Sequence, residues 1–255
     1  MNIPSRLFLL LALLGQFLIS GCATAKMDAP LPAVEPGVDT KIPYPGYLGY
    51  MQVYLPENYD EDEDWPVIIY YHGYKSRPNT AIFRAVTGGE DFIIVGVNYA
   101  KREFYQRLAD NQVNHELWHF NQIIESLDRT YSIDKKRLFL SGYSQGGYTT
   151  ALLGEFLLPQ VKGLIILGAG RKNDFAPSDI AGLANKPIFI GAGDKDVPHG
   201  VRARQAAKSY LDWQADVTLE LWYNMDHLNG FQIYMKNPKA RYNIQNWLKK
   251  HAELE

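Results

Sequence analysis

The residues with the clearest chemical potential form the segment Gly142-Tyr143-Ser144-Gln145-Gly146. Residues 138–140 before it are an apolar run of strand length, and residues 148–158 after it have helical composition, so the chain must turn at Ser144. A serine on a tight strand-to-helix turn projects its hydroxyl from the edge of a sheet, and glycines two residues to either side leave room for the backbone to reverse. The segment therefore predicts that Ser144 is a nucleophile.

Two later segments supply groups that could activate this serine. Asp194 and Asp196 follow one strand-like run, and His227 follows the next. A histidine can accept the serine proton while an aspartate fixes its tautomer and stabilises the imidazolium. Spacing to the strand end permits either aspartate. His199 is closer in sequence to Asp194, but it lies at an expected helix start and ranks behind His227.

Taken together, these motifs resemble the α/β-hydrolase superfamily. The residues that carry the resemblance are His72-Gly73, Gly142-Tyr143-Ser144-Gln145-Gly146-Gly147, Asp194 and His227. The resemblance covers residues 46–251 and is strongest to compact carboxylesterases, feruloyl esterases and polyhydroxybutyrate-depolymerase-like esterases. It implies an α/β-hydrolase fold with a mostly parallel central sheet, helices on both faces and a Ser-Asp-His triad. In the family the acid is the first aspartate of Gly-x-x-Asp-x-x-Val-Pro, which implies Asp194 instead of Asp196.

The resemblance also implies an oxyanion hole. The family uses a His-Gly-x turn after an early strand to aim one backbone N–H at the substrate oxygen. That donor corresponds here to Tyr74, with Gly73 as the second choice, and the other donor is Gln145 at the start of the helix, whose dipole favours a developing oxyanion. His72 is then expected to be structural.

The activity implied is hydrolysis of carboxylic esters through an acyl-enzyme, with no cofactor. The short connection between the strand-like runs at residues 164–167 and 187–190 leaves no room for a large lid, so we expect an open cleft for small or chain-end esters. Two alternatives remain open. One is a peptidase of the prolyl-oligopeptidase type, which usually carries an extra gating domain, and the other is a non-catalytic surface binding protein on the same fold.

A second motif competes with this interpretation. His115-Glu116-Leu117-Trp118-His119 matches the His-Glu-x-x-His pattern of zinc proteases. At 100° per residue, the apolar stripe of this expected helix places both histidines on the opposite, solvent face. The stripe consists of Val113, Leu117, Phe120, Ile124 and Leu127. No third ligand is evident downstream, so we expect no metal site.

The amino-terminal segment predicts export and lipidation. Residues 7–19 are apolar and too short to span a bilayer comfortably, as in a signal peptide. Ile19-Ser20-Gly21-Cys22 resembles the lipobox of bacterial lipoproteins, and Cys22 is the only cysteine. We therefore expect a signal peptide over residues 1–21 and a lipid anchor at Cys22. Ala23 after the cysteine favours the outer membrane, with the protein facing the periplasm.

The remaining sequence predicts one domain. Residues 22–45 are proline-rich and are expected to form a tether, and residues 46–255 are expected to form the α/β-hydrolase domain. Strand-like and helical segments alternate along this domain, which predicts a mainly parallel sheet with an antiparallel pair at one edge. The formal net charge of −2 and the absence of a basic stripe give no reason to expect nucleic acid as a partner. The partners expected are an ester substrate and the membrane; the oligomeric state is left open.

Overall fold

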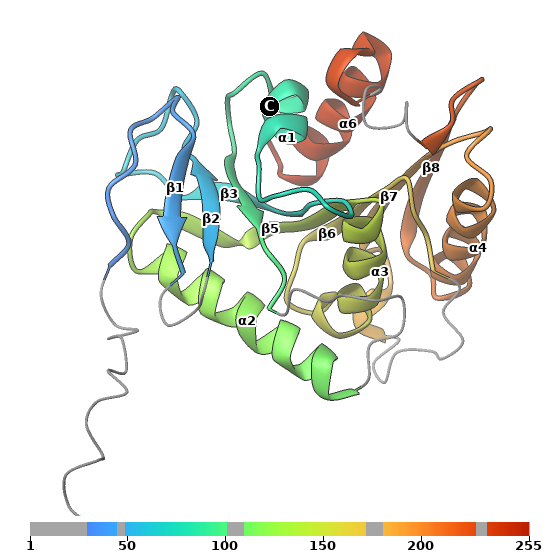
Figure 1. Ribbon diagram of the computed structural model, residues 1–255, viewed down its shortest axis with the longest axis horizontal. Helices are drawn as coiled ribbons and strands as arrows, with labels where there is room; N and C mark the ends of the chain where they lie inside the picture. The colour runs from blue at the N-terminus through green and yellow to red at the C-terminus, as the bar shows by residue number, and fades with distance from the viewer. Residues whose placement is uncertain (1–29, 45–48, 101–109, 172–180, 228–233, 255) are drawn as a thin grey trace, which may run out of the picture.

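A computed structural model of the chain places a single sheet between two layers of helices (Figure 1). The structure describes residues 30–44, 49–100, 110–171, 181–227 and 234–254. The predicted signal peptide, residues 1–21, and the predicted lipidation site at Cys22 lie outside the described residues. Within the described part of the chain, no helix is both long and apolar enough to cross a bilayer.

The sheet has eight strands in the order β1-β2-β4-β3-β5-β6-β7-β8. The strands are β1 (Thr40–Pro43), β2 (Tyr50–Tyr54), β3 (Trp65–Tyr71), β4 (Ile93–Val97), β5 (Ile133–Tyr143), β6 (Gly163–Leu167), β7 (Pro187–Gly193) and β8 (Asp216–Trp222). The pairs from β4 through β8 are parallel, whereas β1 pairs with β2 and β2 with β4 in antiparallel fashion. This confirms the predicted α/β fold with antiparallel strands at one edge.

Helices cover both faces of the sheet, and β3, β4, β6 and β7 are accordingly buried along their whole length. The longer helices are α1 (Ala81–Thr87), α2 (Asp110–Asp128), α3 (Gln145–Leu157), α4 (His199–Asp212) and α6 (Pro238–His251), and a 3-10 turn, η1, spans Ala181–Leu183. In Figure 1, α1 and α6 lie on one side of the sheet, and α2 and α3 lie on the other. Alternate side chains of a strand enter the two cores: Ile69 packs in the cluster with α2, α3 and α4, and Ile68 packs in the cluster with α1 and α6.

The expected tether is wrong for residues 30–44. Leu31 is 6% exposed, and its backbone N–H donates to Thr130 Oγ1 at 2.8 Å. Ile42 is fully buried on β1, which hydrogen-bonds to β2. These residues belong to the folded domain because their apolar side chains complete the core beside α2, a role that a proline-rich composition does not reveal. The domain therefore begins earlier than residue 46.

Candidate active site

Three polar side chains converge at the carboxyl edge of the sheet. Ser144 follows β5, Asp196 lies in the loop after β7, and His227 lies in the loop after β8. Parallel strands present their carboxyl ends at one edge, so loops that are far apart in sequence meet there. Ser144 and His227 were predicted to lie together, and the structure confirms that they do.

The turn at Ser144 has the conformation that a nucleophile elbow requires. Ser144 has φ 56° and ψ −117°. Residues other than glycine rarely adopt a positive φ. A Cβ on Gly142 would lie 2.2 Å from the Gly146 carbonyl oxygen, and one on Gly146 would lie 1.9 Å from the Tyr71 carbonyl oxygen. Both glycines are therefore needed because backbone fills the space that a side chain would occupy, as the motif predicted.

The hydrogen bonds at Ser144 fix the roles of the atoms. Ser144 Oγ lies 2.8 Å from His227 Nε2, and His227 Nδ1 lies 2.7 Å from Asp196 Oδ2. An ionised carboxylate only accepts hydrogen bonds, so Nδ1 carries the proton and Nε2 of the neutral ring presents its lone pair to the serine hydroxyl. The ring is thus held in the tautomer that can accept the serine proton.

The predicted choice of Asp194 as the acid is wrong in this structure. Asp196 contacts His227, whereas Asp194 Oδ1 accepts a hydrogen bond of 3.3 Å from the Met225 N–H. The reason is that backbone hydrogen bonds continue beyond the end of β7 at Gly193. The Asp194 N–H donates to the carbonyl of Trp222, the last residue of β8, and the Lys195 N–H donates to that of Met225. The chain turns away only after Lys195, so the carboxylate that reaches the histidine is that of Asp196.

A second histidine shares the same carboxylate. His199, the first residue of α4, lies with its Nδ1 2.7 Å from Asp196 Oδ1. The rings of His199 and His227 stack with centroids 4.0 Å apart and an interplanar angle of 18°. One potential metal-ligand atom from each of Asp196, His199 and His227 lies within 4.8 Å of the other two. Both Nδ1 atoms, however, already face a carboxylate oxygen, which is the geometry of a hydrogen-bonded network.

Tyr143 also holds His227 in place, a role that the sequence did not indicate. Its hydroxyl donates to the His227 carbonyl oxygen at 2.6 Å, and the two rings stack with centroids 5.6 Å apart. The residue before the nucleophile therefore fixes both the backbone and the ring plane of the base. The position before the serine in a Gly-x-Ser-x-Gly motif is variable, so the motif does not indicate such a contact. For Asp196 and His199, the i, i+3 spacing at a helix start could have drawn attention to the pair.

The predicted oxyanion hole remains a prediction. A Cβ on Gly73 would lie 3.6 Å from Ser144 Cβ, so the turn after β3 does pass beside the nucleophile. Tyr74 follows with a side chain that is 64% exposed, and Gln145 begins α3, so its N–H points out of the amino-terminal end of that helix. His72 is buried, and its Nδ1 lies 2.8 Å from the Gly73 carbonyl oxygen, as a structural role requires.

The prediction for the His-Glu-x-x-His segment is right that Val113, Phe120 and Leu127 are buried, but it is wrong that both histidines face solvent. Glu116 is 1% exposed and His119 is 2% exposed, whereas Leu117 is only half-buried and His115 is exposed. Glu116 accepts a hydrogen bond of 2.9 Å from the Tyr71 hydroxyl and one of 2.8 Å from the Ala100 N–H. The stripe was incomplete because polar contacts to neighbouring segments, instead of apolar packing, determine part of the buried face.

Burial shifts the acid–base properties of these two side chains in opposite directions. Desolvation raises the pKa of Glu116 to about 7, and the hydrogen bonds from Ala100 and Tyr71 limit that rise. Desolvation lowers the pKa of His119 to about 4, while a backbone hydrogen bond at Asn98 opposes the shift. His119 also packs edge-on against Tyr44, with centroids 4.7 Å apart. Glu116 and His119 therefore lie on the buried face of α2, away from the exposed His115, and help to pack the helix against the domain.

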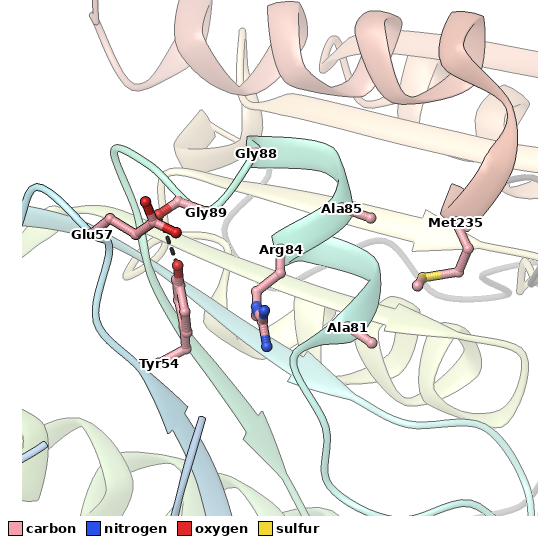
Figure 2. A pocket seen from close by; sticks show the side chains of 8 residues that line it. All are labelled: Tyr54, Glu57, Ala81, Arg84, Ala85, Gly88, Gly89 and Met235. Atoms are coloured by element: carbon pink, nitrogen blue, oxygen red, sulfur yellow. Dashed lines mark hydrogen bonds between the residues drawn. The ribbon is translucent and has the colours of Figure 1, made fainter. Parts of the chain in front are cut away.

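A hollow of about 330 Å³ lies away from the triad, beside α1 (Figure 2). It is lined by Tyr54, Glu57, Ala81, Arg84, Ala85, Gly88, Gly89 and Met235. The Tyr54 hydroxyl donates to the Gly89 carbonyl oxygen at 3.0 Å, and the Arg84 guanidinium lies over the Tyr54 ring. None of these lining residues belongs to the triad, and Tyr54 pairs with Ile94 near the start of β4, at the amino end of that strand.

The eight-stranded sheet with helices on both faces is the α/β-hydrolase fold. The Esterase family model, described as "Putative esterase", matches residues 50–161. A bifunctional acetylxylan esterase/xylanase of Neocallimastix patriciarum is 29% identical over 104 residues, which are 39% of this chain and only 15% of that protein. The chain therefore matches a small part of the length of that curated relative.

Solved esterase structures share the fold at low sequence identity. A thermostable esterase from Pseudomonas putida superposes with a TM-score of 0.64 at 17% identity, covering 89% of this chain and 85% of that chain. A ferulic acid esterase from the anaerobic fungus Anaeromyces mucronatus superposes with a TM-score of 0.57 at 17% identity, covering 85% of this chain and 96% of that chain. These likenesses identify the architecture as the one found in esterases.

Proposed function

We propose that this protein hydrolyses carboxylic esters through an acyl-enzyme formed on Ser144. The observation that carries the proposal is the continuous chain of hydrogen bonds from the Ser144 hydroxyl through His227 to Asp196, with distances of 2.8 and 2.7 Å. A serine hydroxyl is a weak nucleophile until a base within hydrogen-bond reach takes its proton, and a third group must orient that base. The esterase family match over residues 50–161 supports the choice of an ester as the substrate.

The proposed mechanism has two half-reactions. His227 Nε2 removes the proton as Ser144 Oγ attacks the carbonyl carbon, and the imidazolium that forms is stabilised by Asp196. The tetrahedral oxyanion is held by the backbone N–H groups of Tyr74 and Gln145. His227 then gives the proton to the departing alcohol, which leaves the acyl group on Ser144. Water repeats the sequence and releases the carboxylic acid.

The substrate we propose is a small or chain-end ester, such as an acetylated sugar or a feruloyl ester. The relatives named above include an acetylxylan esterase/xylanase and a ferulic acid esterase, which supports testing these acyl groups first. Ser144 is only partly buried, and Tyr74, which follows the neighbouring Gly73, has a largely exposed side chain, so an acyl group attached to a larger molecule can approach. The measurement that ranks the substrates is kcat/KM across acetylated sugars, feruloyl esters and short nitrophenyl esters.

A fluorophosphonate probe tests the proposed activity without knowledge of the natural substrate. We expect covalent labelling of Ser144 and hydrolysis of short nitrophenyl esters, both abolished in Ser144→Ala while circular dichroism stays unchanged. A folded wild-type protein that takes no label and turns over no ester would favour a non-catalytic binding protein instead. Turnover of proline-containing amides at rates equal to those of esters would favour the peptidase alternative.

We further propose that Cys22 is lipidated and anchors the protein in the bacterial cell envelope, in the outer membrane and facing the periplasm. The support is the sequence Ile19-Ser20-Gly21-Cys22 after an apolar segment, followed by Ala23. Expression in a Gram-negative host should give a membrane-fraction protein whose amino-terminal peptide carries diacylglycerol and acyl chains by mass spectrometry. Cys22→Ser should release it from the membrane fraction. Recovery of unmodified wild-type protein in the soluble fraction would contradict lipidation.

A further inference from the structure

The acid of the triad serves two histidines at once. Asp196 Oδ2 faces His227 Nδ1 and Asp196 Oδ1 faces His199 Nδ1, each at 2.7 Å. Because the carboxylate can only accept, each ring must donate its Nδ1–H. Asp196 is 3% exposed, so solvent can contribute little to its hydrogen bonding.

We propose that His199 is a positioning residue for the triad: its hydrogen bond to Asp196 holds the carboxylate so that the second oxygen faces His227. The catalytic part of this inference rests on the proposed esterase function. The orientation of the carboxylate itself is a property of the folded protein and can be measured without turnover.

The burial of Asp196 is the first reason why its second oxygen needs a donor. Within the described part of the chain, the His199 side chain donates the hydrogen bond that Asp196 Oδ1 accepts. A buried carboxylate oxygen without a donor is costly, so a carboxylate deprived of His199 would turn toward other donors or admit water. Either change would misplace Oδ2 relative to the His227 ring. His199 thus supplies a restraint that the bond to His227 alone does not provide.

The position of His199 on α4 is the second reason. It is the first helical residue, and the Gly200 N–H that follows it donates to the Asp196 carbonyl oxygen at 2.5 Å. Backbone and side chain therefore both tie Asp196 to the start of α4. The His199 ring then stacks on His227 at 4.0 Å, so one residue restrains the acid by a hydrogen bond and the base by ring contact.

The charges around His199 favour its neutral form. Partial burial lowers its pKa, the hydrogen bond to Asp196 opposes that shift, and the nearby His227 and Arg202 lower the pKa further. The Arg202 guanidinium donates to the Tyr148 hydroxyl at 2.8 Å and lies over that ring, so these groups complete the polar surroundings. Because His199 stays neutral, His227 alone carries the positive charge that forms during turnover.

Two substitutions separate the hydrogen bond from the ring contact. His199→Asn keeps an N–H donor near the position of Nδ1 and removes the ring, whereas His199→Phe keeps an aromatic ring and removes the donor. We expect kcat to fall by roughly tenfold or more in His199→Phe, because misplacement of a triad group by a fraction of an ångström is costly. We expect His199→Asn to stay within about threefold of wild type and KM to change little in both variants.

The pH profile gives a readout that a merely structural role would not move. Loss of the His199 donor misplaces Asp196 Oδ2, so the carboxylate stabilises the His227 imidazolium less well. The acidic limb of kcat/KM should therefore move to lower pH in His199→Phe and move less in His199→Asn. Equal loss of kcat in both variants, or no loss in either, overturns the proposal, as does an acidic limb that moves to higher pH in His199→Phe.

Proton NMR keeps this test independent of the esterase activity. The far-downfield signal of the His227 Nδ1–H bonded to Asp196 should persist in His199→Asn and be lost or shifted in His199→Phe. Persistence in both variants, or loss in both, overturns the positioning role. If the wild-type protein shows this NMR pattern but hydrolyses no ester and takes no fluorophosphonate, the proposed function fails while the positioning of Asp196 stands.

Discussion

Asp194 and Asp196 differ by two positions, yet they make different contacts. Asp196 accepts hydrogen bonds from both His199 and His227, whereas Asp194 Oδ1 accepts one from the Met225 backbone N–H. The pair therefore forms a matched test of the proposed triad. Asp196→Asn would place a donor or a weaker acceptor against His227 and disturb its tautomer.

We expect Asp196→Asn to lower kcat by roughly 10³-fold or more, on the scale known for the triad acid of serine proteases. Asp194→Asn keeps an oxygen that can accept the Met225 N–H, so its kcat should remain within about threefold of wild type. Rates of nitrophenyl ester hydrolysis and of fluorophosphonate labelling provide the measurements. An inactive Asp194→Asn beside an active Asp196→Asn would restore the original choice of acid.

Gly146 tests the geometry of the elbow. A Cβ there would meet the Tyr71 carbonyl oxygen at 1.9 Å, a backbone atom that cannot move aside cheaply. We expect Gly146→Ala to lower the free energy of unfolding by more than about 3 kcal/mol or to abolish folding. Gly88→Ala is the control, because Gly88 has φ +74° but no atom within 4 Å of its would-be Cβ, so only about 1 kcal/mol of backbone strain applies. Urea denaturation would compare them, and equal losses would mean that the close approach to Tyr71 is not limiting.

The sequence predicts a residue's place well where the backbone conformation allows only one residue type. Gly142 and Gly146 are such positions, and the motif located Ser144 from them. It was uninformative where two like residues compete for one place, because the difference between Asp194 and Asp196 depends on where β7 stops pairing with its neighbour. That end point is set by backbone contacts with the loop after β8, which no local pattern encodes.

At the scale of the element, α2 shows why an apolar helical period can define the buried face only in part. The predicted stripe contained Leu117 and Ile124, but both are half-buried, and Glu116 and Ile123 occupy the inner face. A carboxyl group on the inner face breaks the apolar period. Its partner, the Tyr71 hydroxyl on β3, is a contact between segments that only the folded chain reveals.

The buried Glu116 predicts a pH-dependent contribution to stability. Its pKa is about 7 in the folded protein, against an ordinary value of 4.5, so between these pH values the folded state binds more protons than the unfolded state. The stabilising contribution is therefore complete below about pH 4.5 and is lost as the pH rises through 7. Glu116→Gln removes this dependence and keeps an amide oxygen for the Ala100 N–H.

We expect the free energy of unfolding of Glu116→Gln, relative to wild type, to increase between pH 5 and pH 8 by up to about 3 kcal/mol. His115→Gln on the exposed face of the same helix is the control and should change little over that range. Urea denaturation at both pH values would measure the difference. A relative stability that does not change between pH 5 and pH 8 would show that Glu116 is already ionised in the folded protein at pH 5.

At the scale of the whole molecule, the alternation of strands and helices was enough to predict the parallel sheet and the edge at which its loops meet. The element order from β3 to α6 follows the sequence pattern closely, because buried parallel strands are apolar throughout and the helices between them are long. The short α1 and the edge strand β1 were missed. Thr40–Pro43 has four residues, one of them fully buried, and its place depends on pairing with β2.

The missed edge strand leads to a prediction about where the domain begins. Leu31, Val34 and Ile42 are buried in the cluster that also contains α2 side chains, and each large apolar side chain contributes about 1.5–3 kcal/mol when fully buried. Deletion of residues 1–29 should leave the free energy of unfolding unchanged within about 1 kcal/mol. Deletion of residues 1–45 should lower it by more than about 4 kcal/mol, since these three side chains, the buried Tyr44 and the β1 pairing are lost together.

Urea denaturation of the two truncated proteins would measure this difference, and Leu31→Ala in the longer protein separates packing from length. That substitution alone should cost about 2 kcal/mol or more, because Leu31 is 6% exposed and its N–H is held by Thr130. Deletion of 1–45 also exposes the free edge of β2, so the shorter protein should aggregate at lower concentration in light scattering. Equal stability of the two truncated proteins would instead return residues 30–45 to the role of a tether and put the start of the domain at residue 46.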